Sequence, residues 1–209
     1  MRTPVKLLLA STNAGKLSEY RTLAIGRDIV VDLLPQFQNI PGFPEDAPTF
    51  AENAAGKALH YSKHFRGDRD GIVFADDSGL VVPSLGGAPG VHSARYAGPN
   101  ATDSERVAKL LGELRGKDGD TRLAHFVCVV AAAREGRMLA IFSDLAEGTI
   151  TEEPRGRNGF GYDPVFYSAE RAKTFAELNE TEKNEISHRG KALRKLMEYV
   201  ISPGRSHLG

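Results

Sequence analysis

The sequence predicts an α/β fold in which helices flank an elongated, mixed β-sheet. Three short apolar runs suit strands that are buried on both faces, at residues 5–10, 29–34 and 72–75. Segments with helical periodicity follow these runs. Two further strand-like segments, residues 123–133 and 138–142, predict a pair of long strands joined by a short turn. Together these elements predict a central mixed sheet whose long strands form a second lobe.

The first part of the chain is predicted to form strand, turn, helix and strand. The apolar run at residues 5–10 ends in a turn of small and polar residues at 11–16. A helical pattern then follows through Leu17, Tyr20, Leu23 and Ala24. After the second strand, residues 35–48 contain four prolines and should form an irregular loop. Thr49 and Glu52 then have the spacing of a capping box, which predicts the start of a long amphipathic helix.

The middle of the chain contains a further helix and the two long strands. Thr102 and Glu105 repeat the capping-box spacing and predict a helix through Leu114. Residues 112–122 are polar and rich in glycine, which is typical of a surface connection. Residues 134–137 have the composition of the turn between the long strands.

The C-terminal part should add a short strand and a helix. The strand is expected at residues 148–151, and Ser187 is expected to cap the last helix. The apolar face of that helix would comprise Ala192, Leu193, Leu196, Met197 and Val200. Residues 202–209 are expected to fray. Because no repeat, low-complexity tract or linker is visible, we expect residues 1–209 to form one domain with two lobes.

Composition excludes several classes of protein. A chain of 209 residues with 41% hydrophobic and 26% charged residues can bury a sizeable core and is neither disordered nor fibrous. Lys and Arg total 27, as do Asp and Glu, so the formal net charge is zero. Proteins that bind nucleic-acid polymers usually have a basic excess, so no such partner is expected. An anionic partner should therefore be small and bound by a local cluster.

The only cysteine, Cys128, excludes an intramolecular disulfide and a zinc site built on paired cysteines. Its apolar neighbours predict a buried structural thiol. The apolar run near residue 1 is too short for a signal peptide, and no run approaches the roughly 18 residues of a membrane span. We therefore expect a cytoplasmic protein with no membrane partner.

Two motifs follow strands and suggest a phosphate site and a metal site. Ser11-x-Asn13-x-x-Lys16 would expose backbone N–H groups and a lysine at a helix start, although an ordinary capped turn explains the pattern equally well. Asp76 and Asp77 are adjacent and should point to opposite faces of a strand. They suit either a turn before a glycine or oxygen ligands of Mg²⁺ beside a substrate phosphate.

Other charged residues are candidates for the site but also have a local structural explanation. Glu45 and Asp46 lie in the proline-rich loop, whereas Glu52 suits a helix cap and Lys57 an exposed helical lysine. Residues 159–166 contain two glycines and two aromatic residues, which suits either a tight turn or a loop that stacks on a flat ring.

A basic cluster at the start of the last helix opposes the helix dipole. It consists of Lys183, His188, Arg189 and Lys191. A bound anion or the polar edge of a base would relieve the conflict, although a solvated basic face is the alternative. Taken together, the motifs suit a nucleoside triphosphate with Mg²⁺. They fit neither a dinucleotide-binding fingerprint nor a serine-hydrolase elbow.

Six motifs in order resemble those of the inosine/xanthosine triphosphate pyrophosphatases. They are S-T-N-A-G-K, T-F-A-E-N-A-A-G-K-A, A-D-D-S-G-L, L-G-G-A-P-G-V-H-S-A-R-Y-A-G, G-F-G-Y-D-P-V-F and K-N-E-I-S-H-R-G-K-A-L. The resemblance extends from about residue 7 to about residue 197. It implies an elongated α/β fold with the active site in a cleft between two lobes, a homodimer and a Mg²⁺ requirement. It also implies hydrolysis of ITP, dITP and XTP to monophosphate and pyrophosphate, which keeps these nucleotides out of DNA and RNA.

The resemblance assigns roles to individual residues. Asp77 matches the catalytic base and a metal ligand, and Glu45 matches the other metal ligand, with Asp46 as the alternative. Substrate contacts are implied for Ser11, Thr12, Asn13, Ala14, Gly15, Lys16, Lys57, Ser78, Phe160, Gly161, Tyr162, Asp163, Lys183, His188 and Arg189. Two other functions remain open from the sequence. One is a pyrophosphatase for another modified nucleotide, such as a methylated pyrimidine triphosphate, and the other is a nucleotide sensor without hydrolysis.

Overall fold

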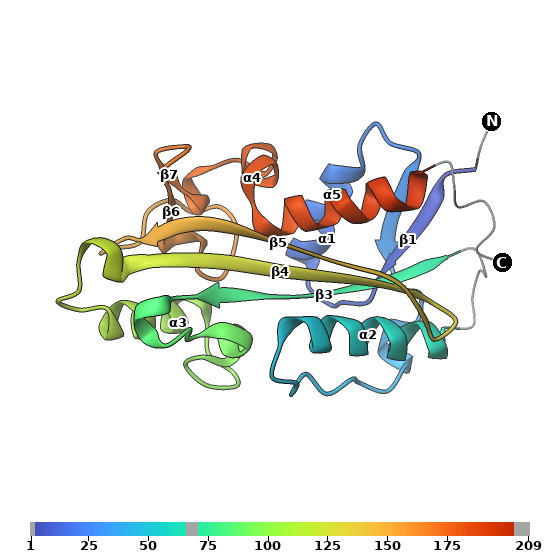
Figure 1. The fold of residues 1–209 in the computed structure, drawn as a ribbon, viewed down its shortest axis with the longest axis horizontal. Helices are drawn as coiled ribbons and strands as arrows, with labels where there is room; N and C mark the ends of the chain where they lie inside the picture. Colours follow the sequence, from blue (N-terminus) through green and yellow to red (C-terminus); the bar gives the residue numbers. More distant parts are fainter. Residues whose placement is uncertain (1–2, 66–70, 203–209) are drawn as a thin grey trace.

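The computed structural model describes residues 3–65 and 71–202, whose strands form a seven-stranded sheet (Figure 1). The order is β2-β1-β3-β4-β5-β6-β7. The strands are β1 (Val5–Leu9), β2 (Ile29–Leu33), β3 (Ile72–Val81), β4 (Leu123–Arg134), β5 (Arg137–Ile150), β6 (Phe166–Ser168) and β7 (Lys173–Thr174). β1 pairs in parallel with β2 and β3, and the other neighbours are antiparallel. The predicted mixed sheet is therefore confirmed.

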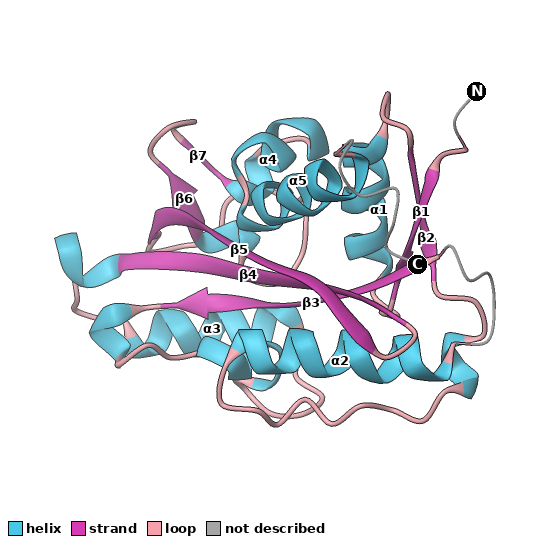
Figure 2. Ribbon diagram, turned by 45° about the vertical axis from the view of Figure 1, so that its right-hand side comes forward, coloured by secondary structure: helices cyan, strands magenta, loops and turns pink. Residues whose placement is uncertain are grey.

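Helices cover both faces of this sheet (Figure 2). The helices are α1 (Ala14–Ala24), α2 (Phe50–His64), α3 (Asp103–Glu113), α4 (Glu180–Ile186) and α5 (His188–Ile201). α1, α4 and α5 lie on one face, whereas α2 and α3 lie on the other, at opposite ends of the long strands (Figure 1). Among the described residues, no helix has the length and apolar character needed to cross a membrane.

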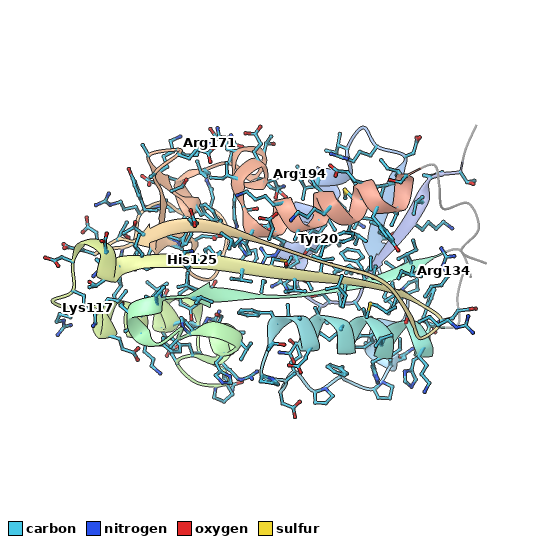
Figure 3. All side chains as sticks on the ribbon, viewed as in Figure 1. Tyr20, Lys117, His125, Arg134, Arg171 and Arg194 are labelled. Carbon is cyan, nitrogen blue, oxygen red and sulfur yellow. The ribbon has the colours of Figure 1, made fainter. Side chains whose placement is uncertain are left out.

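The apolar strands are buried because each face of the sheet has its own core. In β1, Leu7 and Leu9 pack with α1 and α5, while Leu8 packs with α2 on the opposite face. Alternate residues of a strand point to opposite faces, so a strand covered on both sides needs a continuous apolar run. Tyr20 of α1, labelled in Figure 3, is completely buried in the first of these cores. Cys128 lies in the same core, which confirms the expected buried thiol.

A third core at the far end of the long strands forms the second lobe. It combines Val107 and Leu110 of α3 with Phe126 of β4, Phe166 of β6 and the following segment. The long antiparallel strands β3, β4 and β5 connect this lobe to the lobe built on β1, β2, α1, α2 and α5 (Figure 1). The two-lobed arrangement expected from the sequence is therefore confirmed.

Two strand boundaries expected from the sequence are wrong. β3 does not end before Asp76 but continues to Val81, because β4 pairs with it from Val73 to Val81. Residues 148–151 are not a separate strand, since β5 runs without a break to Ile150 along the long strand β4. The hydrophobic pattern of the sequence does not reveal the full length of β5, because many residues of this strand are exposed or only partly buried.

The helix starts were predicted better than the helix count. The hydroxyls of Thr49, Thr102 and Ser187 cap α2, α3 and α5 as expected. Helix α4 was missed, although its cap, Asn179, is followed three residues later by Glu182 in a capping box. α1 begins at Ala14, within the segment expected to be a turn. Of the C-terminal residues expected to fray, 203–209 lie outside the described residues.

Candidate active site

A cavity of about 230 Å³ lies where β1 ends and β3 continues between the two lobes. Pairing between β1 and β3 stops at Leu9 and Phe74. On that side the next part of β3 borders the cavity, while its other edge remains paired with β4. The residues predicted from the sequence that line it are Asn13, Lys16, Glu45, Asp77, Ser78, Phe160, Gly161, Tyr162, Asp163, His188 and Arg189. The fold thus gathers residues that span most of the chain.

The start of α1 supplies Asn13 and Lys16 to the cavity. The Asn13 side chain caps the helix by accepting the Lys16 N–H at 3.1 Å, and Ser11 Oγ accepts the Asn13 N–H at 3.1 Å. The first turn of α1 contains no acidic residue, so the helix dipole presents positive potential here. Thr12 and Ala14 are exposed and do not line the cavity. This arrangement can bind an anion through helix N–H groups and one lysine.

Asp76 faces the side of the sheet that α1 and α5 cover. Its carboxylate contacts Lys16 Nζ at 2.8 Å and lies 3.7 Å from Arg189 Nε. Burial alone would raise the pKa of Asp76, but the Lys16 and Arg189 charges outweigh it and lower the pKa to about 2. Asp76 therefore remains ionised and balances the cations behind the cavity.

Asp77 points to the opposite face, as the strand geometry predicted, and meets α2 there. Asp77 Oδ2 accepts a hydrogen bond from Asn53 at 3.0 Å, and its Oδ1 lies 3.8 Å from Lys57 Nζ. Lys57 also contacts Glu45 at 2.9 Å. Burial raises the pKa of Asp77, while Lys57 opposes that rise. Two carboxylates therefore share one ammonium group at the edge of the cavity.

The acidic alternatives from the sequence now have definite positions. Glu45 lines the cavity, whereas Asp46 is exposed and does not. Glu52 accepts a hydrogen bond from the Thr49 hydroxyl at 2.7 Å, as a helix cap would. Among the described residues, no group of three or more His, Cys, Asp and Glu side chains forms a metal site.

The basic cluster is neutralised by carboxylates that sequence analysis missed. Glu19 of α1 contacts Lys183 at 2.7 Å and Arg189 at 2.7 Å, and Asp163 contacts Lys183 at 2.6 Å. Burial would raise the pKa of Glu19, but the charges of Arg189 and Lys183 lower it overall. Lys183 and Arg189 therefore already have carboxylate partners within the protein, which partly balances the charge expected to oppose the dipole at this helix start. Lys183 belongs to the last turn of α4, where a cation suits the dipole.

His188 lies at the cavity with its ring stacked on Phe126, at a centroid distance of 4.7 Å and an angle of 10°. Complete burial and the neighbouring Arg189 charge hold the pKa of His188 well below its usual value. Its ring is therefore neutral at pH 7.

Arg194, labelled in Figure 3, joins α4 to α5 by donating to the carbonyls of Asn184 at 2.8 Å and Glu185 at 2.9 Å.

The aromatic loop forms the remaining wall. Phe160 is half-buried, and its ring lies 4.9 Å from Lys183 Nζ and 5.0 Å from the Arg189 guanidinium. Gly15 permits this packing, because a Cβ at that position would lie 3.1 Å from the Phe160 ring. Tyr162 is buried and donates a hydrogen bond to the Ser93 carbonyl at 2.9 Å. Phe160 is thus the aromatic residue of this loop that has a partly accessible ring.

Several residues of the site were given no role from the sequence. Asp103 accepts the Gly161 N–H at 2.6 Å and also pairs with Arg106, whose side chain lines the cavity. Glu19 and the cavity residue Phe126 were likewise missed. Asn53, Ser93 and Ala94 lie within two of the quoted motifs but were given no role. Glu19 offered one usable signal, because it lies beside Tyr20 on the side of α1 that is buried.

Comparison with known proteins identifies the family. The sequence matches the Ham1 family over residues 7–199. It is 50% identical over 193 residues to the dITP/XTP pyrophosphatase of Geobacillus kaustophilus, covering 92% of this chain and 93% of that protein. The structure matches a HAM1 protein from Coxiella burnetii with a TM-score of 0.81 and 44% identity, over 94% of this chain and 98% of that one.

The Ham1 protein of Staphylococcus aureus matches with a TM-score of 0.80 and 35% identity, over 93% of this chain and 97% of that one. These matches span both lobes and confirm the resemblance found in the motifs. The chain belongs to the Ham1 family.

Proposed function

We propose that this protein is a nucleoside triphosphate pyrophosphohydrolase that converts ITP, dITP and XTP to the monophosphate and pyrophosphate. The observation that carries the proposal is one cavity lined by Glu45 and Asp77 together with Lys16 and the start of α1. A triphosphate needs the cationic part, and its hydrolysis needs the carboxylates. The name of the 50% identical relative supports the substrate class. Removal of these nucleotides would keep them out of DNA and RNA.

Asp77 acts as the general base in this proposal. A water oxygen attacks the α-phosphorus, the bond from that phosphorus to the bridging oxygen of the β-phosphate breaks, and pyrophosphate leaves. Asp77 takes the proton of the water. Asn13 and Lys16, with the N–H groups of α1, hold the phosphates, and Ser78 borders them.

The donor set fits Mg²⁺. Glu45 and Asp77 offer carboxylate oxygens that already converge on one cation, Lys57. Mg²⁺ is usually held by one or two carboxylates together with substrate phosphates and water. When bound, the ion supplies positive charge that stabilises the developing charge on the phosphates. Glu45 is proposed as the second ligand because it lines the cavity and Asp46 does not.

Base recognition is proposed for Phe160, His188 and Arg189. Phe160 would stack on the purine, while His188 Nδ1 and Arg189 Nε are buried nitrogens with no hydrogen-bond partner among the described residues. Donors that bind the 6-oxo group of ITP would meet the 6-amino group of ATP. A site built on such a bond discriminates by roughly 10⁴-fold or more.

We also propose a homodimer, as the family resemblance suggests, together with a cytoplasmic location and one catalytic domain over residues 1–209. Because the formal net charge is zero, no nucleic-acid polymer is proposed as a partner. These points are part of the proposal. The single sheet that runs through both lobes supports one domain.

The proposal is tested by pyrophosphate release from ITP, XTP, dTTP and ATP with and without Mg²⁺. We expect rapid pyrophosphate release from ITP and XTP only, and only with Mg²⁺. Release from dTTP in preference to ITP would instead indicate an enzyme for pyrimidine nucleotides. Nucleotide binding without any release would indicate a sensor. Orthophosphate with nucleoside diphosphate as products would contradict attack at the α-phosphorus.

A further inference from the structure

The proline-rich loop that carries Glu45 runs along the outer side of α2 (Figures 1 and 2). Two contacts hold the middle of this loop on the helix. The ring of Phe43 packs on Gly56, where a Cβ would lie 2.3 Å from Phe43 Cζ. The Phe43 N–H donates to Tyr61 Oη at 3.2 Å. The loop is therefore attached to α2 just before the acidic pair.

Asn53 of α2 attaches the other end of the acidic segment and also reaches β3. Its Oδ1 accepts the Ala47 N–H at 3.1 Å, and its Nδ2 donates to Asp77 Oδ2 at 3.0 Å and to the Ala47 carbonyl at 3.5 Å. The side chain is almost fully buried. A flipped amide would point its NH₂ group at a backbone N–H and its oxygen at a carboxylate, so only one orientation satisfies all partners.

Lys57 lies one turn further along the same face of α2 and makes a different link. It contacts Glu45 at 2.9 Å and lies 3.8 Å from Asp77. An ammonium group on a four-carbon stem is a flexible point charge, so it neutralises carboxylates without fixing their separation. The side chain of Asn53 is shorter, and its amide forms a directional hydrogen bond. This bond uses Asp77 Oδ2 and leaves Oδ1 available to another ligand.

We propose that Asn53 is a positioning residue that holds the carboxylates of Glu45 and Asp77 at the spacing needed to bind Mg²⁺. Asn53 does not line the cavity, so it acts through Asp77 and the loop and not on the substrate. The inference rests on the proposed function, in which Glu45 and Asp77 hold the metal ion. Hydrogen-bond partners of metal ligands typically affect metal affinity or activity by about 10–100-fold.

Two variants and one control test this role. Asn53→Leu has a similar volume and no hydrogen-bonding group, and Asn53→Ser keeps a polar side chain that is too short to reach both partners. Ser62→Ala is the matched control on the same helix. Ser62 is buried, and its hydroxyl accepts the Gly136 N–H at 3.1 Å and donates to the Leu59 carbonyl at 3.1 Å. Neither hydrogen bond involves Asp77 or the loop that carries Glu45.

The measurement is calorimetric titration of Mg²⁺ into the full-length protein saturated with a non-hydrolysable α,β-imido analogue of ITP. We expect both Asn53 variants to weaken Mg²⁺ binding by about 10-fold or more. The Ser62→Ala variant should stay within about twofold of the parent, because its lost hydrogen bonds do not touch the carboxylates. Affinity for the analogue in EDTA should be unchanged in all variants, and high Mg²⁺ should restore much of the turnover of the Asn53 variants.

The inference is overturned if the Asn53 variants bind Mg²⁺ as tightly as the parent, whatever their stability. It is also overturned if Ser62→Ala weakens Mg²⁺ binding equally, which would indicate a general loss of structure. If Asn53→Leu does not fold, Asn53→Ser decides alone. A parent that binds Mg²⁺ but releases no pyrophosphate would refute the proposed function, while the calorimetry would still decide the role of Asn53.

Discussion

The charge of Asp76 should stabilise this protein by an amount that depends on pH in a predictable way. Its carboxylate is buried, with Lys16 at 2.8 Å and Arg189 at 3.7 Å. These cations lower the pKa of Asp76 from 3.8 to about 2, against the opposing effect of burial. Replacement by asparagine removes the charge and nearly preserves the shape, so Asp76→Asn resembles the protonated acid at every pH.

The magnitude follows from the two pKa values. Their difference (3.8 − 2) corresponds to about 2 kcal/mol at about 1.36 kcal/mol per pKa unit. Because the pKa is lower in the folded protein, this stabilisation is fully present well above pH 4 and is lost as the pH falls toward 2. At pH 3 about half of this stabilisation should remain.

Urea unfolding of the parent and Asp76→Asn at pH 7 and pH 3 measures this difference directly. We expect the free energies of unfolding to differ by about 2 kcal/mol at pH 7, a Tm decrease of roughly 4–8 °C, and by about half as much at pH 3. Asp32→Asn is the control, because its pair with Arg21 is exposed and should contribute less than about 1 kcal/mol. A difference that is equal at both pH values, or absent at pH 7, would refute the charge balance described for this site.

Three further substitutions test the site and the fold. Asp77→Asn should leave the circular dichroism spectrum unchanged and lower kcat for ITP by about 10²–10⁴-fold, and a variant within a few-fold of the parent would show that the base lies elsewhere. Phe160→Ala should raise KM for ITP, XTP and ATP alike, because stacking does not distinguish purines, so a changed preference in initial-rate assays would contradict this role. Gly190→Ala should destabilise the protein by about 1–3 kcal/mol in urea unfolding, because the added Cβ would lie 2.0 Å from the Asn184 carbonyl oxygen. This loss is expected although alanine favours helices more than glycine does. An equally stable variant would contradict the close packing of α4 and α5.

Much of the fold could be predicted from apolar runs and helix caps in the sequence. The apolar runs at β1, β2 and β3 predicted strands because both faces of this sheet are covered, and the cap residues of α2 and α5 marked the helix starts. Capping depends on residues within one turn of each other, so the sequence records it directly. The lengths of β3 and β5 could not be predicted in this way, since pairing with β4 and not local composition extends them.

For the candidate site too, local sequence predicted some features and the tertiary structure decided the others. Sequence alone determined which residue types would meet there: a lysine at a helix start, adjacent aspartates facing opposite sides of a strand, and an aromatic loop between glycines. The chain fold decided which charges are already paired. Glu19 neutralises Lys183 and Arg189 from 164 and 170 residues away, and Asn53 reaches Asp77 across the interface between α2 and β3. Such contacts leave no periodic or local trace in the sequence, because they exist only when packed helices and strands bring distant side chains within about 3 Å in a site that excludes water.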